Sequence, residues 1–178
     1  VVASNLAPVK ITVHMVAALV LLALLIYIFH LVSPKIKNNV SSSKLMKALY
    51  VALALTVVQI MLGTQVREEV DSISKALNHL QRETWAEKLS MLFKFHRSFS
   101  LLVLALNAWI VYQSLKLFAS IDKIKLQASL IALLIAAEIV VGAVLGYFSF
   151  PAALQPVHLL LASFLFGIQF RYILLLTK

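Results

Sequence analysis

The stretch from residue 11 to residue 32 reads ITVHMVAALVLLALLIYIFHLV and contains no lysine, arginine, aspartate or glutamate. An apolar run of about 18 or more residues is long enough to cross a bilayer as an α-helix. Comparable runs follow at residues 48–66, 93–115, 126–150 and 152–174. None of them alternates apolar and polar residues as a membrane-spanning β-strand does. The sequence therefore predicts an all-α integral membrane protein with five spans and the lipid bilayer as its surroundings.

A net charge of +9 is typical of nucleic-acid-binding proteins, so the positions of the basic residues must be considered. These residues are unevenly distributed along the chain. Residues 33–47 carry four lysines and no acid, and residues 116–125 carry three lysines and one aspartate. Residues 66–90 contain four basic and five acidic side chains, whereas residues 146–157 are uncharged. Lysine and arginine in short loops stay on the cytoplasmic side. We therefore expect a cytoplasmic C-terminus, an outer N-terminus and no nucleic-acid partner.

Three histidines begin apolar helices that run in the same direction, so this topology places them at similar depth near the outer surface. Each is followed four residues later by a small residue, in the pairs His14/Ala18, His96/Ser100 and His158/Ala162. A single histidine there could simply occupy the headgroup region. Three with the same spacing favour a ligand site, because the small residue leaves room for a flat ligand beside the imidazole.

Haem fits these histidines better than zinc does. Zinc usually takes three or four ligands, commonly including cysteine or carboxylate. The chain has no cysteine, and Glu138 lies more than two turns from the histidines along its own helix. Haem iron needs only one or two axial side chains and an apolar slot, which helical bundles build from facing helices.

The two remaining histidines are not expected to be ligands. His30 lies at the inner end of the first span and is expected to reach the cytoplasmic interface. His79 lies in residues 72–92, whose apolar spacing predicts an amphipathic helix on the membrane surface.

Two segments share a motif made of a polar residue, isoleucine, two apolar residues and glycine. They are VVQIMLGTQVRE at residues 57–68 and AAEIVVGAVLGYF at residues 136–148, with Gln59 and Glu138 at the polar position. An ionisable group inside a span is costly and is usually functional or paired. Glu138 can therefore have a functional role or form a hydrogen bond across helices, and both interpretations remain open. Gln59 is the residue at the same position of the other segment.

The motif predicts an internal repeat of helical hairpins. Residues 48–115 and 126–174 each contain one apolar helix followed by a histidine helix. Residues 1–32 then correspond to the second helix of a third copy.

Four segments in this order resemble the C-terminal part of haem A synthase. They are VVASNL followed by ITVHMVAALVLLALL, then QIMLGTQV, FHRSFSLLVLAL and LQPVHLLLASFLFG, and the resemblance covers essentially the whole chain. Members of that family have eight spans in two pseudo-symmetric halves, each with a histidine pair, and oxidise a methyl group of haem O.

The resemblance implies that residues 46–178 are a four-helix C-terminal half in which His96 and His158 ligate the iron of haem b. Residues 1–45 would be the last helix of an incomplete first half plus a cytoplasmic linker. His14 would belong to the second, incomplete haem site, completed by a missing N-terminal half or companion segment. The family's first-half glutamate and loop cysteines have no counterpart here, so the catalytic residues are unknown.

The resemblance implies that the chain relays electrons through haem b for the oxidation of the substrate haem O to haem A. The electron donor is unknown, and the implied location is a bacterial plasma membrane. The alternative is a membrane b-type cytochrome similar to cytochrome b561, which transfers electrons without hydroxylation. That group carries histidines at both membrane depths, whereas the candidates here share one side. Arg97 follows a candidate ligand, and we expect its guanidinium to bind haem propionates.

Overall fold

The computed structural model describes residues 8–33 and 42–177, and within them the chain is helical without any β-strand. The long helices are α1 (Pro8–Val32), α2 (Ser43–Ala76), α4 (Met91–Leu117), α5 (Asp122–Tyr147) and α6 (Leu154–Leu176). Two short elements, η2 (Arg82–Thr84) and α3 (Trp85–Lys88), connect α2 to α4. All five long helices are long and apolar enough to cross a membrane, which confirms the predicted all-α membrane fold. Lys35 and Lys37 of the predicted cytoplasmic linker lie outside the described residues.

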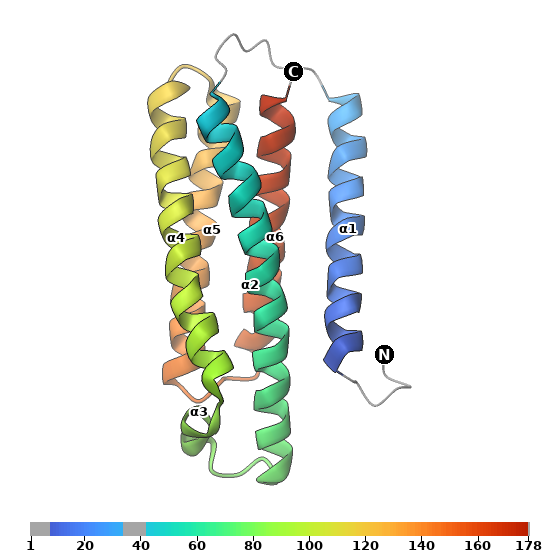
Figure 1. Cartoon of the computed structure of the whole chain (residues 1–178), viewed down its shortest axis with the longest axis vertical. Helices are drawn as coiled ribbons and strands as arrows, with labels where there is room; N and C mark the ends of the chain where they lie inside the picture. The colour runs from blue at the N-terminus through green and yellow to red at the C-terminus, as the bar shows by residue number, and fades with distance from the viewer. Residues whose placement is uncertain (1–7, 34–41, 178) are drawn as a thin grey trace.

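Four of the helices form a bundle, and the fifth lies along one side of it (Figure 1). Helices α2, α4, α5 and α6 pack side by side, whereas α1 contacts α2 and α6. Helices α1, α4 and α6 run in one direction, and α2 and α5 run in the opposite direction (Figure 1). The first turns of the three histidine helices therefore lie toward the same end of the molecule, as the sequence predicts.

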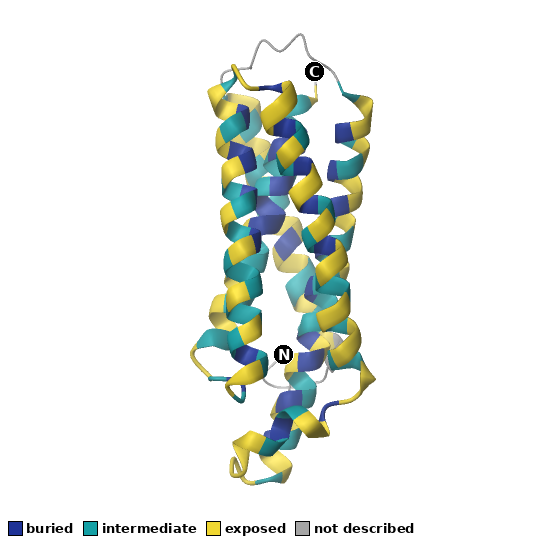
Figure 2. Cartoon of the chain, turned by 90° about the vertical axis from the view of Figure 1, so that its left-hand side faces the viewer, coloured by how far each residue is buried: buried dark blue, intermediate teal, exposed yellow. Residues whose placement is uncertain are grey.

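The buried residues lie on the inward faces of the helices (Figure 2), and the outward faces carry many large apolar side chains. Leu49 on α2, Ile110 on α4 and Ile124 on α5 are fully buried. By contrast, Leu25 on α1 and Leu133 on α5 are each 65% exposed. Apolar surface of this extent needs a non-aqueous environment, and a bilayer supplies it.

The pattern of burial repeats between the two hairpins of the bundle. Buried residues of α2 recur in α5 at one constant offset, and buried residues of α4 recur in α6 at another. The α2/α5 pairs are Leu45/Ile124, Leu49/Ala128, Ala52/Ile131, Thr56/Ile135 and Val66/Leu145; the α4/α6 pairs are Val103/Leu165, Asn107/Gln169 and Ile110/Tyr172. The two hairpins therefore turn corresponding faces toward the shared core.

The predicted surface helix over residues 72–92 is wrong. Helix α2 continues to Ala76, so it extends about 15 Å beyond residue 66 at the rise of an α-helix. A turn, η2 and α3 follow, and the apolar residues of this segment pack onto the end of the bundle around Trp85, which is 4% exposed. The segment buries its apolar face against protein, because the extended α2 provides a surface on which Trp85 can pack.

Two hydrogen-bonded contacts fix this segment. Glu69 on α2 accepts hydrogen bonds from the backbone nitrogen and the hydroxyl of Ser90, at 2.7 and 3.1 Å. Ser90 is also the N-cap of α4 and accepts a hydrogen bond from Leu92 N. The start of α4, and with it the position of the residues in its first turns, is thus tied to the end of α2.

The fourth span ends earlier than the apolar run that predicted it. Helix α5 ends at Tyr147, whereas the run continues to residue 150. Ser149 and Phe150 have φ values of 57° and 54°, a left-handed conformation that stops a helix. The carbonyl oxygen of Phe150 accepts hydrogen bonds from Arg82 Nη2 at 2.8 Å and from Gln155 Nε2 at 3.3 Å, which hold this turn against the α2–α4 connection.

Candidate functional site

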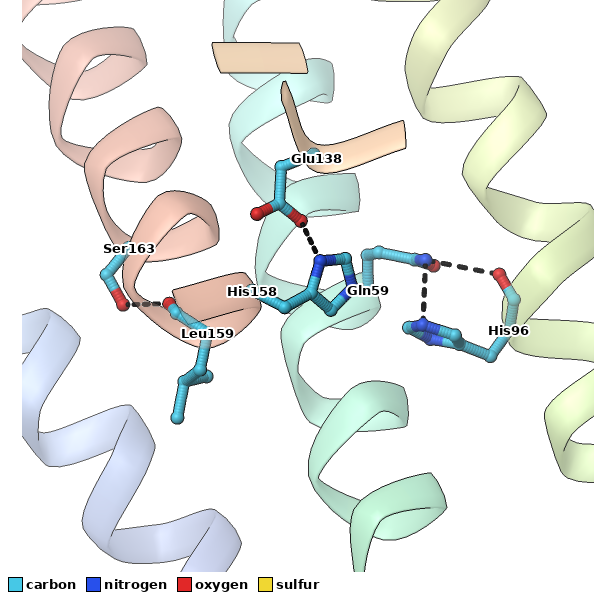
Figure 3. Close-up of polar contacts among 6 residues, drawn as sticks. All are labelled: Gln59, His96, Glu138, His158, Leu159 and Ser163. Atoms are coloured by element: carbon cyan, nitrogen blue, oxygen red, sulfur yellow. Dashed lines mark hydrogen bonds and ion pairs between the residues drawn. The ribbon is translucent and has the colours of Figure 1, made fainter. Parts of the chain in front are cut away.

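His96 and His158 lie in the first turns of α4 and α6, and their imidazoles point toward one another across the bundle (Figure 3). Both side chains are partly buried. The two helices are parallel because each is the second member of its hairpin. Corresponding residues of the two repeats therefore face each other, and the structure brings the two predicted ligands together.

A glycine from the neighbouring helix of the same hairpin lies against each imidazole. A methyl group on Gly63 of α2 would lie 3.3 Å from Cε1 of His96. A methyl group on Gly142 of α5 would lie 3.2 Å from Cε1 of His158 and 3.7 Å from its Nε2. Carbon atoms in good contact are about 3.5–4.0 Å apart, so any larger residue would push either ring. The glycines of the repeated motif are thus contact surfaces for the histidines.

The polar residue of each motif lies one turn before the glycine and contacts the same histidine (Figure 3). Gln59 Nε2 donates a hydrogen bond of 3.1 Å to the carbonyl oxygen of His96 and lies 3.5 Å from His96 Nε2. Glu138 Oε2 lies 3.1 Å from His158 Nδ1. The expectation that Glu138 is more than two turns from the histidines is therefore wrong, because α5 packs against α6 and brings the two side chains together. This last pair is at ion-pair distance, but the ring N–H is not aligned with the carboxyl oxygen for a hydrogen bond. The two histidines therefore have chemically different neighbours.

Four buried polar atoms around the two rings have no hydrogen-bond partner: Gln59 Oε1, His96 Nδ1, Glu138 Oε1 and His158 Nδ1. Buried polar groups in proteins are nearly always satisfied, and an unsatisfied group in hydrocarbon costs several kcal/mol. Their concentration around two facing imidazoles is the feature expected of residues that receive a polar or metal-containing group.

A haem meets the requirements of this donor set. The described residues contain no cluster of three or more histidine, aspartate or glutamate side chains that could hold a metal ion on their own. Haem iron needs only one or two protein ligands, and two imidazoles on facing helices could serve as these ligands. The absence of a side chain on each glycine lets the imidazole lie close against the neighbouring helix.

His14 does not join this pair. It lies on an exposed position of α1, and α1 contacts the bundle through other residues. Thr12 and Thr64 hydroxyls lie 2.9 Å apart, and Leu19 is buried between α1, α2 and α6. Helix α1 thus turns His14 away from the core of the bundle.

Arg97 is exposed next to His96 in the sequence, and its guanidinium lies 5.9 Å from the ring centroid of Phe93. Phe93 in turn makes an edge-to-face contact with Phe150. The arginine therefore lies on the surface next to the two-histidine site, at its rim, beside Phe93.

The two histidines not expected to be ligands also lie apart from the pair. His79 is exposed in the turn after α2, where its Nδ1 lies 2.8 Å from the Ser74 hydroxyl. His30 lies in the last turn of α1.

Sequence reasoning missed a second polar layer deeper in the bundle. Gln169 Nε2 donates a 2.9 Å hydrogen bond to Asn107 Oδ1, and the Tyr172 hydroxyl donates one of 2.6 Å to Ser114 Oγ. Asn107 and Gln169 are 62 positions apart in the chain, the same separation as His96 and His158. The internal repeat could therefore have identified them, because each follows its histidine by three helical turns.

The fold and site define an integral membrane protein whose helical bundle brings two histidines together within the membrane region. The chain belongs to the COX15-CtaA family, described as cytochrome oxidase assembly protein, whose model matches residues 1–170. This is the haem A synthase family. No curated protein and no solved structure gives a significant match to the chain.

Proposed function

We propose that this chain binds one haem b between His96 and His158 and relays electrons for the oxidation of haem O to haem A. Family membership implies a role in the haem A assembly of cytochrome oxidase. The observation that carries the finer proposal is the pair of facing imidazoles, each against a glycine and surrounded by unpartnered buried polar atoms. When bound there, haem would supply one-electron transfer.

In this proposal the residues of the chain have separate roles. His96 and His158 would hold the iron. Gly63 and Gly142 let the two rings lie close against α2 and α5. Arg97, at the rim, would bind the anionic propionates, since arginine binds carboxylates in a bidentate manner. Residues 46–178 form the haem-binding half, and residues 1–45 contribute a helix to a neighbouring half that carries the substrate haem.

The topology proposed from the basic loops places this site on the outer side of a bacterial plasma membrane. The charged end of α2 and the short helix α3 lie at the same end of the molecule as the first turns of α4 and α6 (Figure 1). An electron donor would approach from that side.

The test is reconstitution of the purified chain with iron protoporphyrin IX in detergent or nanodiscs. We expect one haem per chain and a low-spin spectrum in the reduced state. His96→Ala or His158→Ala should give a high-spin spectrum or no bound haem, whereas His79→Ala should retain the wild-type spectrum. An unchanged low-spin spectrum in the double variant His96→Ala/His158→Ala would rule out this ligand pair.

A further inference from the structure

We propose that Glu138 is a positioning residue that makes the two candidate iron ligands unequal, with His158 the more strongly donating ligand. The carboxyl group of Glu138 would hold His158 through Nδ1 and leave Nε2 for the iron. His96 has no such acceptor at its Nδ1. This inference rests on the proposed haem site and adds a specific role for a residue outside the ligand pair.

The comparison between the two hairpins isolates the difference. In both hairpins a polar residue lies one turn before a glycine, and in both the glycine contacts Cε1 of the histidine. At these otherwise corresponding places one hairpin has Gln59 and the other has Glu138. The two hairpins therefore share the backbone arrangement at this place. They differ in the side chain, which is an amide in Gln59 and a carboxyl group in Glu138.

The two side chains also contact different atoms of their histidines. Glu138 Oε2 lies 3.1 Å from Nδ1 of His158. The amide nitrogen of Gln59 lies near Nε2 of His96 and donates to its backbone carbonyl, while Nδ1 of His96 is buried without a partner. A carboxyl oxygen can accept the Nδ1–H of an imidazole after a small rotation of the ring. An amide nitrogen cannot accept it.

The environment of Glu138 strengthens this contact. The Glu138 side chain is 13% exposed and that of His158 is 27% exposed. An electrostatic contact is stronger in such a low-dielectric setting than in water. An acceptor on the second ring nitrogen of a metal-binding histidine fixes its tautomer and orientation and increases its electron donation to the metal. Stronger axial donation stabilises ferric iron and lowers the reduction potential of a haem.

The experiment compares variants of the full chain reconstituted with iron protoporphyrin IX. Glu138→Gln should keep a low-spin spectrum, raise the midpoint potential and weaken ferric haem binding by about 10-fold. Ser163→Ala is the matched control on α6, because that hydroxyl donates only to the Leu159 carbonyl of its own helix (Figure 3).

A measurement without haem tests the contact directly. Nitrogen-15 NMR of the haem-free chain should show His158 as the Nδ1–H tautomer in the wild type and a mixture of tautomers in Glu138→Leu, which has no acceptor for the Nδ1–H. Equal tautomer populations in both proteins, or an unchanged midpoint potential in Glu138→Gln, would overturn the inference. Failure of the wild-type chain to bind haem would instead refute the proposed function, so the two failures are distinguishable.

Discussion

Gln169 on α6 donates a 2.9 Å hydrogen bond to Asn107 on α4, and the two residues occupy corresponding positions of the two hairpins. Both are fully buried. Their separation of 62 positions is also that of His96 and His158. A pseudo-twofold axis therefore relates the hairpins, and Asn107 meets its own counterpart, Gln169, in the core of the bundle.

The amide pair should stabilise the bundle measurably. Asn107→Leu and Gln169→Leu each leave a buried partner without its hydrogen bond, so each should lower the free energy of unfolding. We expect a coupling energy of about 1 kcal/mol from the double-mutant cycle, measured by unfolding in micelles. Tyr112→Leu, at a 60% exposed position of α4, is the control. Strictly additive effects of the two substitutions would contradict a direct interaction.

The two motif glycines should be intolerant of even a methyl group. Gly63→Ala and Gly142→Ala place a carbon 3.3 and 3.2 Å from the imidazoles, so both should shift a ring and weaken haem retention by about 10-fold. Gly146→Ala is the matched control, because its nearest atom is Phe93 Cζ at an ordinary 3.6 Å. Haem transfer to apomyoglobin measures the retention. Equal retention in all three variants would show that the glycines do not form the site.

His14 should be dispensable for the haem held by the other pair. It is exposed on α1, so His14→Ala should leave the stoichiometry at one haem and the low-spin spectrum unchanged. Absorption spectroscopy with a pyridine haemochrome assay measures both. Loss of the low-spin bands in this variant would mean that His14 is a ligand and that α1 belongs to the same site.

Arg97 should contribute to haem binding through charge. Arg97→Gln removes the cation at the rim, and we expect weaker haem binding with an unchanged low-spin spectrum. Lys116→Gln removes a cation at the opposite end of the same helix and serves as the control. Dissociation rates at low and high salt measure the effect. Identical rates for wild type and Arg97→Gln would place the propionates elsewhere.

The contact between Arg82 and the Phe150 carbonyl should hold the outer connections together. Arg82→Met removes the 2.8 Å hydrogen bond and should increase amide hydrogen exchange over residues 77–90 and 148–153 without unfolding the long helices. Lys88→Met, at an exposed position of α3, provides the comparison. Unchanged exchange in Arg82→Met would mean that the aromatic packing around Trp85 is sufficient.

Much of this architecture could be predicted from the sequence, because apolar run length determines which segments cross a bilayer. The continuation of α2 to Ala76 could not. The segment containing Glu68 and Asp71 is charged and resembles a loop, and it is helical because its apolar face packs with Trp85. The repeat predicted that Gln59 and Glu138 correspond. It could not predict their contacts with the histidines, since these depend on how each helix is rotated about its axis.

The pseudo-twofold axis has a further consequence for the pair Gln59 and Glu138. Two identical subunits related by true symmetry must carry the same side chain at corresponding positions. Here both hairpins belong to one polypeptide, so a substitution in one copy leaves the other unchanged. The covalent connection between the copies therefore permits an amide beside one imidazole and a carboxyl group beside the other, a chemical asymmetry that no symmetric homodimer of a single hairpin could have.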